Sequence, residues 1–175
     1  MRLSIIAALS TNNVIGRANG IPWRQSTDLK RLKALTMGHH MIMGRKTWES
    51  LNGAQLPGRV MVVITRRELE VPGLIVVHSL EDAIRVVEES ADGEPFIAGG
   101  SEIYEQSMHR ADRMYLTRVH AEVDGDATFP DFDDVSEWRL VDSEHFEADA
   151  KNQYPYSFLT YDRAGAMGHP IPDEG

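Results

Sequence analysis

The chain has 175 residues, a formal net charge of −9, 42% hydrophobic residues and no cysteine. This length predicts one α/β-sized domain whose core is large enough to enclose a ligand cleft. The acidic balance argues against nucleic acid or an anionic membrane as the main partner. The lack of cysteine excludes disulfides, thiolate metal sites and cysteine nucleophiles, and it fits a cytoplasmic location.

The first two thirds of the chain alternate between short apolar strands and helical patterns. The first apolar run, at 2–9, is too short to cross a bilayer and predicts a strand rather than a targeting segment. Further strands are predicted at 40–44, 59–66, 74–78 and 95–99, and helices at 26–37, 45–51, 79–90 and 101–111. This alternation favours a mostly parallel sheet with helices on both faces.

The pattern changes after residue 110. Three strand-like segments follow with no helical pattern between them, at 113–123, 137–148 and 154–163. They predict antiparallel strands at one edge of the sheet. The last segment, 164–175, contains Gly and Pro without periodicity and predicts a flexible tail, which leaves one domain over 1–163.

Hydroxyl side chains mark three predicted helix starts, at Ser26, Ser79 and Ser101. Two strand-to-helix turns also carry glycine, Gly44 before one helix and Gly99-Gly100 before another. Glycine lets the backbone approach a ligand closely, and a helix start offers free N–H groups to phosphate. Basic residues in a first helical turn oppose the helix dipole, so Arg45 and Lys46 suggest a compensating anion. Ordinary turns with solvated side chains remain the alternative.

Other basic residues lie near the strand at 59–66. Arg66 and Arg67 follow it, at the edge where open α/β sheets bind ligands, and they favour a 2′-phosphorylated dinucleotide. Arg59 follows a Pro57-Gly58 turn, which would aim its guanidinium at a ligand carboxylate. A plain basic turn stays open for both. The histidines show no metal-ligand spacing, and no metal is predicted.

One acidic residue, Asp28, lies among apolar residues without an evident Arg or Lys partner on its face. A first-turn acid or helix cap is the simpler interpretation. However, Trp23, Leu29 and Leu32 would surround this carboxyl with apolar surface and raise its pKa. A buried carboxylate can also bind a planar amidine-like edge through both oxygens.

Taken together, "NNVIGRANGIPW", "TDLKRLKALT", "IMGRKTWESL", "LPGRVMVVITR", "IAGGSEIYEQ" and "YLTRVHAEVDGDATFPD" resemble the dihydrofolate reductase family in order and spacing over residues 2–163. The resemblance implies a mostly parallel twisted sheet of about eight strands with an antiparallel C-terminal strand and about four flanking helices. It also implies NADPH-dependent reduction of 7,8-dihydrofolate to tetrahydrofolate, in support of one-carbon and thymidylate metabolism. A cytoplasmic monomer that binds antifolates follows from the same resemblance.

The resemblance also assigns roles to individual residues. In the reaction Asp28 would bind the pterin and promote protonation at N5, Thr117 would bond to that carboxylate, and Trp23 would hold a water. The substrate pocket would comprise Ile6, Ala7, Leu29, Leu32, Lys33, Leu51, Leu56, Arg59, Ala98 and Tyr104. The nicotinamide side would comprise Ala8, Ile15, Gly16 and Asn19. The pyrophosphate and ribose would contact Gly44, Arg45, Lys46, Thr47, Gly99, Gly100, Ser101, Glu102, Ile103 and Tyr104. The adenine end would contact Thr65, Arg66, Arg67, His78 and Ser79.

Two loops and one peptide bond complete what the resemblance implies. The segment 12–23 would be a mobile loop that closes over the nicotinamide and excludes water. Gly125 and Asp126 would support it. The Gly99-Gly100 peptide bond would be cis, a form that survives only where its surroundings fix it.

Departures from the family pattern raise a hypothesis about inhibitors. Trp23 is followed by Arg24-Gln25-Ser26, Leu32 replaces a common Phe, Ala98 replaces a larger aliphatic residue, and Ser101 replaces a Gly. These changes would widen the pocket and reduce sensitivity to trimethoprim, unless neighbouring side chains compensate. Two alternatives to the reductase stay open, namely the related reductase of riboflavin synthesis and a non-catalytic nucleotide-binding module. Asp28 and Arg59 favour folate.

Overall fold

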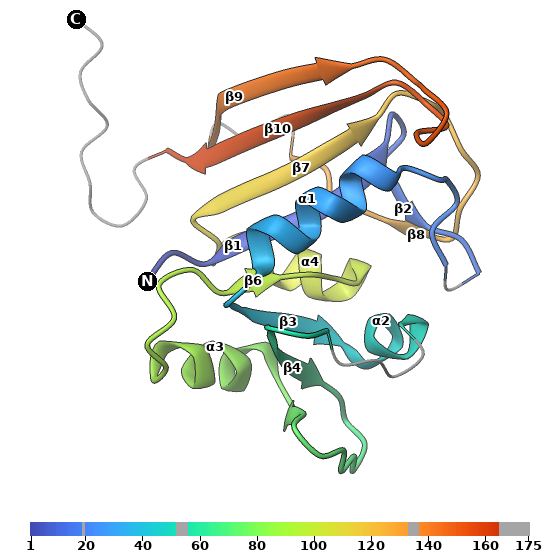
Figure 1. Cartoon of the computed structure of the whole chain (residues 1–175). Coiled ribbons are helices and arrows are strands. Elements are labelled where there is room, and N and C mark those ends of the chain that lie inside the picture. The colour runs from blue at the N-terminus through green and yellow to red at the C-terminus, as the bar shows by residue number, and fades with distance from the viewer. Residues whose placement is uncertain (19, 52–55, 133–136, 165–175) are drawn as a thin grey trace, which may run out of the picture.

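The computed structural model describes residues 1–18, 20–51, 56–132 and 137–164. Four helices and ten strands are formed within these residues (Figure 1). The helices are α1 (Ser26–Thr36), α2 (Arg45–Ser50), α3 (Leu80–Glu88) and α4 (Ser101–Ser107). The strands are β1 (Ser4–Ser10), β2 (Val14–Gly16), β3 (His40–Gly44), β4 (Val60–Ile64), β5 (Ile75–Val77), β6 (Phe96–Ile97), β7 (Arg113–Val119), β8 (Ala127–Thr128), β9 (Trp138–Phe146) and β10 (Tyr156–Arg163). No helix of the described chain is long and apolar enough to cross a membrane.

Eight strands form one mixed sheet in the order β5-β4-β3-β6-β1-β7-β10-β9, while β2 and β8 pair separately. All neighbours from β5 to β7 are parallel, and β10 runs antiparallel to β7 and to β9. The predicted fold class is thereby confirmed. One detail was wrong, because β7 belongs to the parallel part of the sheet. It pairs with all of β1, since α4 supplies the crossover that a parallel neighbour requires.

Of the three predicted hydroxyl caps, one is confirmed. The Ser79 side chain accepts a hydrogen bond of 3.0 Å from the Asp82 N–H at the start of α3. In contrast, Ser26 and Ser101 already lie inside their helices, and Gln25 and Gly100 occupy the preceding cap positions. At the start of α1 the N–H groups of Ser26 and Thr27 are satisfied by the distant residues Lys151 and Asn152, which a local pattern cannot show.

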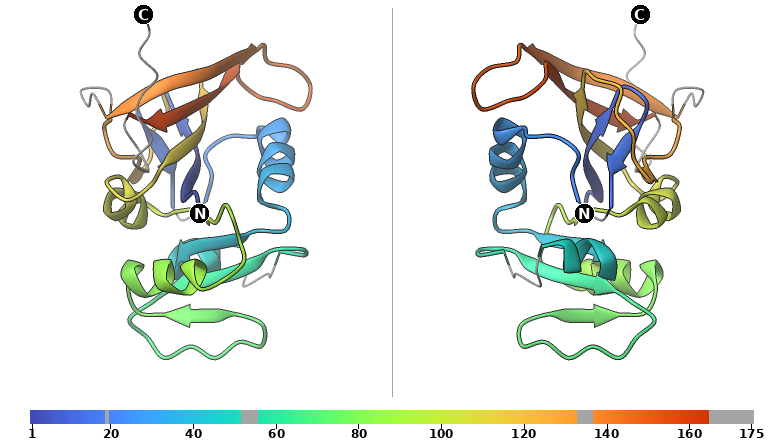
Figure 2. Two further views of the ribbon diagram at one scale, coloured as in Figure 1. Left: turned by 90° about the vertical axis from the view of Figure 1, so that its left-hand side faces the viewer. Right: turned by 90° about the vertical axis from the view of Figure 1, so that its right-hand side faces the viewer.

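Both faces of the parallel strands are buried, as the helices on either side require. On β3 and β4 the side chains alternate: Ile42 and Val62 point into the cluster that includes α3, whereas Met41, Met61 and Val63 point into the cluster that includes Trp48 of α2. Figure 2 shows α1 on the opposite face of the sheet from α3 and α4. The carboxyl ends of the parallel strands therefore lie between two buried layers.

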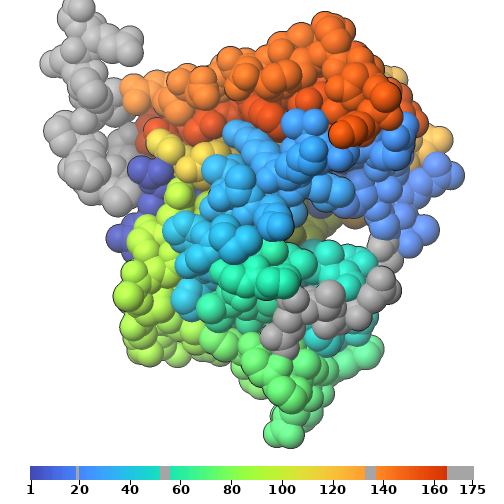
Figure 3. Space-filling view, viewed as in Figure 1, coloured from blue at the N-terminus to red at the C-terminus, as the bar shows by residue number. Residues whose placement is uncertain are grey.

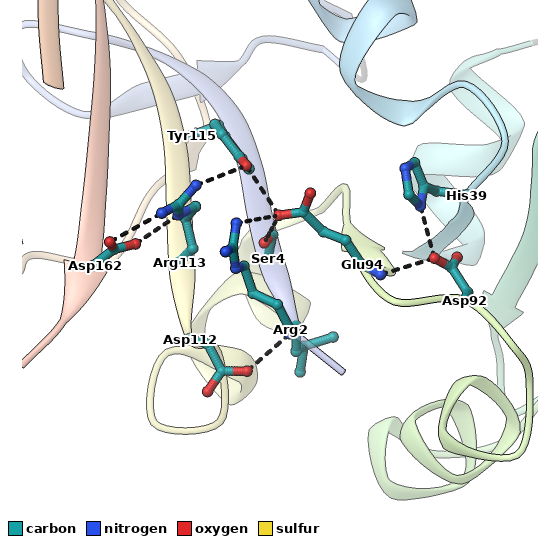
Figure 4. A network of polar contacts seen from close by, with 10 residues as sticks. Arg2, Ser4, His39, Asp92, Glu94, Asp112, Arg113, Tyr115 and Asp162 are labelled. Carbon is teal, nitrogen blue, oxygen red and sulfur yellow. Dashed lines mark hydrogen bonds and ion pairs between the residues drawn. The ribbon is translucent and has the colours of Figure 1, made fainter. Parts of the chain in front are cut away.

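A polar network connects the amino-terminal ends of the parallel strands, at the end of the sheet opposite to the glycine turns (Figure 4). Arg113 donates two hydrogen bonds to the carboxylate of Asp162, at 2.6 and 3.0 Å. Glu94 accepts hydrogen bonds from the Tyr115 hydroxyl at 3.0 Å and the Ser4 hydroxyl at 2.8 Å. These contacts join β1, β7 and β10 to the segment that leads into β6, and so they fix the sheet far from the strand ends that carry the site.

Asp92 anchors the start of β3 in the same region. Its carboxylate lies 2.7 Å from His39 Nδ1 and 2.9 Å from His40 Nδ1, and it accepts the His40 backbone N–H at 2.6 Å. Burial alone would raise the pKa of this carboxyl, but the hydrogen bonds from His39, His40 and the Glu94 N–H lower it to about 2. The folded state therefore favours the ionised form of Asp92.

We expect Asp92→Asn to lower the free energy of unfolding at neutral pH by about 2 kcal/mol. Because the folded pKa is depressed, this stability is present above the usual Asp pKa and is lost as the pH falls toward 2. Urea unfolding at several pH values measures it, with the exposed Glu88→Gln as the control. If the substituted and native chains lose the same stability between pH 4 and pH 2, Asp92 is not the responsible group.

Candidate active site

Two glycine turns lie side by side at the carboxyl ends of β3 and β6. The Gly44 N–H donates to the Gly99 carbonyl at 2.9 Å, and the peptide bond between Gly99 and Gly100 is cis, as the resemblance implied. Gly99 has a φ of +119°, and a Cβ on Gly100 would lie 3.1 Å from the hydroxyl of Thr47. A side chain at either position would enter this small space, so the turns present bare backbone. Their dimensions suit the close approach of a phosphate group.

The predicted basic residues of the α2 turn point in different directions. Arg45 Nη1 lies 2.6 Å from the Glu49 carboxylate, one helical turn further on, whereas Lys46 is exposed. From α4, Ile103 and Tyr104 are buried and Glu102 is exposed. The hydroxyl of Ser101 accepts the N–H of Thr128 at 3.1 Å, so it ties α4 to β8.

A second group gathers at the carboxyl ends of β4 and β5. The Thr65 hydroxyl accepts the Arg67 N–H at 3.0 Å, and its carbonyl lies 2.7 Å from His78 Nδ1. Arg66 and Arg67 are exposed at this edge. The structure therefore brings Thr65, Arg66, Arg67, His78 and Ser79 together as predicted, although the hydroxyl oxygen of Ser79 already caps α3. Two exposed guanidinium groups at a strand end suit a 2′-phosphate.

Asp28 lies in the first turn of α1, half-buried against β7. The Thr117 hydroxyl donates to Asp28 Oδ1 at 2.6 Å. Burial raises the pKa of the Asp28 carboxyl, and the Thr117 hydrogen bond and the charge of Arg31 partly offset this. The prediction that no basic residue accompanies Asp28 was wrong, because Arg31 is three positions along the same helix.

The start of α1 is held by the loop between β9 and β10, which sequence reasoning missed. Gln25 and Asn152 are both buried. The Gln25 side chain donates to the Tyr154 carbonyl at 3.0 Å and accepts the Tyr154 N–H at 2.8 Å. Asn152 accepts the Thr27 N–H at 3.0 Å and donates to the Thr27 hydroxyl at 2.9 Å. These four bonds fix the turn that carries Asp28. The only sequence signal was the pair of amides themselves, at positions far apart.

Apolar side chains line the space beside Asp28. Leu32 of α1 and Ala98 pack against both the Ile6–Phe96–Tyr115 cluster and the methionine cluster of β3 and β4, which Leu51 and Leu56 also contact. Leu29 is 57% exposed, so the burial of Asp28 comes from the sheet and not from Leu29, contrary to the sequence interpretation. Trp23 is half-buried in the segment before α1, and Lys33 is exposed.

Of the two predicted pocket residues on β1, only Ile6 lies on the face of the sheet that carries Asp28. Ile6 is buried on the same side as Phe96, while the neighbouring Ala7 packs into the cluster on the other face with Tyr104. The Tyr104 hydroxyl donates to the Ile6 carbonyl at 2.7 Å. Burial raises the pKa of Tyr104, and the negative charge of Asp28 adds to this. The phenol is therefore a fixed, neutral donor close to the carboxylate.

Arg59 precedes β4 and makes two hydrogen bonds, one within its own turn and one to Thr36 at the end of α1. Its Nε donates to the Pro57 carbonyl at 3.2 Å, and its Nη1 lies 3.5 Å from the Thr36 hydroxyl. Burial lowers the pKa of the guanidinium. Within the described residues no carboxylate pairs with Arg59, and its two contacts join the turn before β4 to the end of α1. Such a guanidinium is suited to binding a ligand carboxylate.

The segment around β2, which the resemblance assigns to the nicotinamide side, is bonded to the loop around Asp126. The Ala18 N–H donates to Asp126 Oδ2 at 3.1 Å, and the Asp126 N–H donates to the Gly16 carbonyl at 3.1 Å. Ile15 and Gly16 are half-buried here, and Ala8 is half-buried on β1. Asn19 lies outside the described residues. The predicted support of this loop by Gly125 and Asp126 is visible as direct contacts.

The fold and the site together define a dinucleotide-dependent oxidoreductase that acts on a small heterocycle. The family model for dihydrofolate reductase matches residues 2–163. A dihydrofolate reductase of Bacillus subtilis is 43% identical over 162 residues, which cover 92% of this chain and 94% of that protein. The type 3 dihydrofolate reductase of Salmonella typhimurium is 40% identical, with 93% and 99% covered. An Enterococcus faecalis dihydrofolate reductase, solved in complex with NADP(H) and RAB-propyl, superposes with a TM-score of 0.86 at 31% identity, with 93% of this chain and 96% of that chain covered.

The chain therefore belongs to the dihydrofolate reductase family. Its activity is the NADPH-dependent reduction of 7,8-dihydrofolate to 5,6,7,8-tetrahydrofolate.

Proposed function

We propose that Asp28 both orients the pterin ring and promotes the protonation of N5. The half-buried carboxyl, with its raised pKa and its hydrogen bond from Thr117, is the observation that carries this role. The Thr117 bond uses one lone pair of Oδ1, so both carboxylate oxygens can still accept an N–H each from the N3 and 2-amino edge of the ring. A carboxyl whose pKa is raised is partly protonated nearer neutral pH, where a proton has to reach N5.

NADPH, when bound, supplies a hydride from nicotinamide C4 to pterin C6, so that the C6–N5 double bond becomes a single bond once N5 takes a proton. The residues present fit this cofactor, because the bare turns at Gly44 and Gly99-Gly100 leave room for the pyrophosphate. Arg66 and Arg67 would hold the 2′-phosphate, and the segment from Ile15 to Ala18 would exclude water from the nicotinamide. Trp23 would hold a water near Asp28.

Arg59 would bind the α-carboxylate of the glutamate moiety, and this distinguishes folate from the flavin precursors of the riboflavin pathway. Support comes from the Arg59 guanidinium, which pairs with no carboxylate of the described residues and is held beside the end of α1 by its contacts with Pro57 and Thr36. Dihydrofolate should therefore support the oxidation of NADPH, measured as the loss of NADPH absorbance, and a pyrimidine of riboflavin synthesis should not. Tight NADPH binding without turnover would instead indicate a binding module.

We also propose that the pocket wall at Leu32 and Ala98 weakens trimethoprim binding. Both side chains pack between the same two clusters, so larger residues at these positions would fill the same space. We expect Leu32→Phe combined with Ala98→Ile to lower the trimethoprim inhibition constant about tenfold, with little change in the KM for dihydrofolate. The Bacillus subtilis relative, assayed in parallel, is the reference. A native inhibition constant as low as that of the relative would contradict the proposal.

The remaining parts of the proposal concern the molecule as a whole. A monomer in the cytoplasm, with dihydrofolate and antifolates as its ligands and with no nucleic acid partner, fits the net charge of −9. Light scattering coupled to gel filtration measures the oligomeric state directly.

A further inference from the structure

Asp28 and Arg31 contact two residues that are paired with each other across adjacent strands of the sheet, Thr117 and Phe158. In the register of the sheet, Thr117 of β7 pairs with Phe158 of β10, and Phe158 pairs with Glu144 of β9. Asp28 accepts a hydrogen bond from Thr117, while the Arg31 guanidinium lies 4.1 Å above the centre of the Phe158 ring. The next strand is about 4.8 Å away, close to the rise of one helical turn, so residues three apart on α1 face adjacent strands.

The packing of α1 against the hairpin of β9 and β10 holds the Arg31 side chain in place. Helix α1 packs directly beneath the hairpin of β9 and β10 (Figure 3). The Arg31 side chain is half-buried there, with its guanidinium 5.9 Å from the centre of the Tyr115 ring as well. A planar guanidinium stacked over an aromatic ring keeps its position better than a flexible ammonium would. The Phe158 ring therefore holds the charge of Arg31 at the face of α1 that also carries Asp28.

Charged and titratable groups act on this pair from every neighbouring element. Burial lowers the pKa of Arg31, and Asp28, Tyr115 of β7, and Asp142 and Glu144 of β9 raise it. From α4, the Tyr104 hydroxyl is neutral. Arg31 thus lies between the carboxyl of Asp28 on one side and two carboxylates of the edge strand on the other.

We propose that Arg31, stacked on Phe158 one helical turn from Asp28, is a positioning residue of the reductase whose fixed positive charge adjusts the pH range of turnover. This inference rests on the role proposed above for Asp28. Arg31 acts through the charge of Asp28 and has no place of its own against the substrate or the cofactor in this proposal. The edge strand takes part, because its two carboxylates oppose the effect of Arg31.

The proposal predicts opposite effects for two substitutions. Arg31→Met removes the positive charge, so Asp28 should hold its proton to a pH about half a unit higher. Glu144→Gln removes a negative charge next to Arg31, so Asp28 should release its proton at a slightly lower pH. Arg31→Lys keeps the charge without the planar stacking and should give a smaller shift than Arg31→Met. Lys30→Met is the matched control, because it removes an exposed charge on the same helix.

Two measurements are made on each chain. Carboxyl-carbon NMR of the protein with labelled aspartate follows the titration of Asp28 directly, with the resonance assigned from Asp28→Asn. NADPH oxidation with dihydrofolate then gives the pH at which turnover falls by half. We expect both midpoints to move together, upward in Arg31→Met and downward in Glu144→Gln, and to stay in place in Lys30→Met.

An Asp28 midpoint that does not move in Arg31→Met, or that moves equally in Lys30→Met, overturns the proposal. So does a turnover midpoint that stays in place while the Asp28 titration moves. A native protein without turnover refutes only the proposed function, since the NMR titration still measures the coupling. Should Arg31→Met fail to fold, Arg31→Gln takes its place, because the amide removes the same charge and leaves a polar side chain at this half-buried position.

Discussion

Asp28→Asn should lower the rate of dihydrofolate reduction at neutral pH by about 10²-fold to 10³-fold, with partial recovery as the pH falls. The amide keeps the shape of the side chain, and its oxygen can still accept the 2.6 Å bond from the Thr117 hydroxyl. It cannot supply a proton, so protonation of N5 then depends on the solvent. Single-turnover NADPH oxidation across a pH series measures the loss and the recovery.

Thr117→Val is the matched comparison for this result. The Thr117 hydrogen bond lowers the pKa of Asp28, so its removal should raise that pKa and move the fall in turnover to higher pH. Asp28→Asn should abolish the part of the pH dependence of turnover that Asp28 causes. Thr117→Val removes only the hydrogen-bond donor and should shift that pH dependence to higher pH. Unchanged turnover in Asp28→Asn at neutral pH, with NADPH bound normally, would assign the proton transfer to another group.

The sequence predicted those parts of the fold and site that depend on local pattern. The alternation of apolar strands and helices located the sheet, and the glycines at Gly44 and Gly99 located the two turns that meet through a 2.9 Å hydrogen bond. Asp28 was singled out because an acid among apolar residues is unusual. For the sheet and the glycine turns a neighbouring stretch of chain contains the physical cause, so the pattern is readable without the structure, whereas the burial of Asp28 comes from the sheet.

What the sequence did not show depends on contacts between distant segments. The amides of Gln25 and Asn152 fix the start of α1 through contacts between distant segments, and the hydroxyl of Ser26 therefore need not act as a cap. The influence of Arg31 on Asp28 likewise depends on the Phe158 ring, which holds the guanidinium in place. Side-chain direction of this kind is set by tertiary packing, and residue spacing alone leaves it open.

Gly125→Ala should slow hydride transfer about tenfold to 100-fold, because the substitution pushes the β2 segment away from the loop that supports it. A Cβ at this position would lie 2.3 Å from Val14 Cγ1 and 2.5 Å from the Gly16 carbonyl oxygen. The second contact is with backbone, so the two segments have to separate. Their separation breaks the bonds that join Asp126 to the Gly16 carbonyl and to the Ala18 N–H.

Gly93→Ala is the control, because a Cβ there would meet nothing within 4 Å. Pre-steady-state NADPH oxidation should separate the effects, with slowed hydride transfer in Gly125→Ala and native rates in Gly93→Ala. The pyrophosphate turns lie on other loops, so NADPH should still bind Gly125→Ala with its phosphate contacts intact. A native rate of hydride transfer in Gly125→Ala would mean that the nicotinamide side tolerates an open β2 segment. The exclusion of water at the reacting atoms would then have to come from elsewhere in the site.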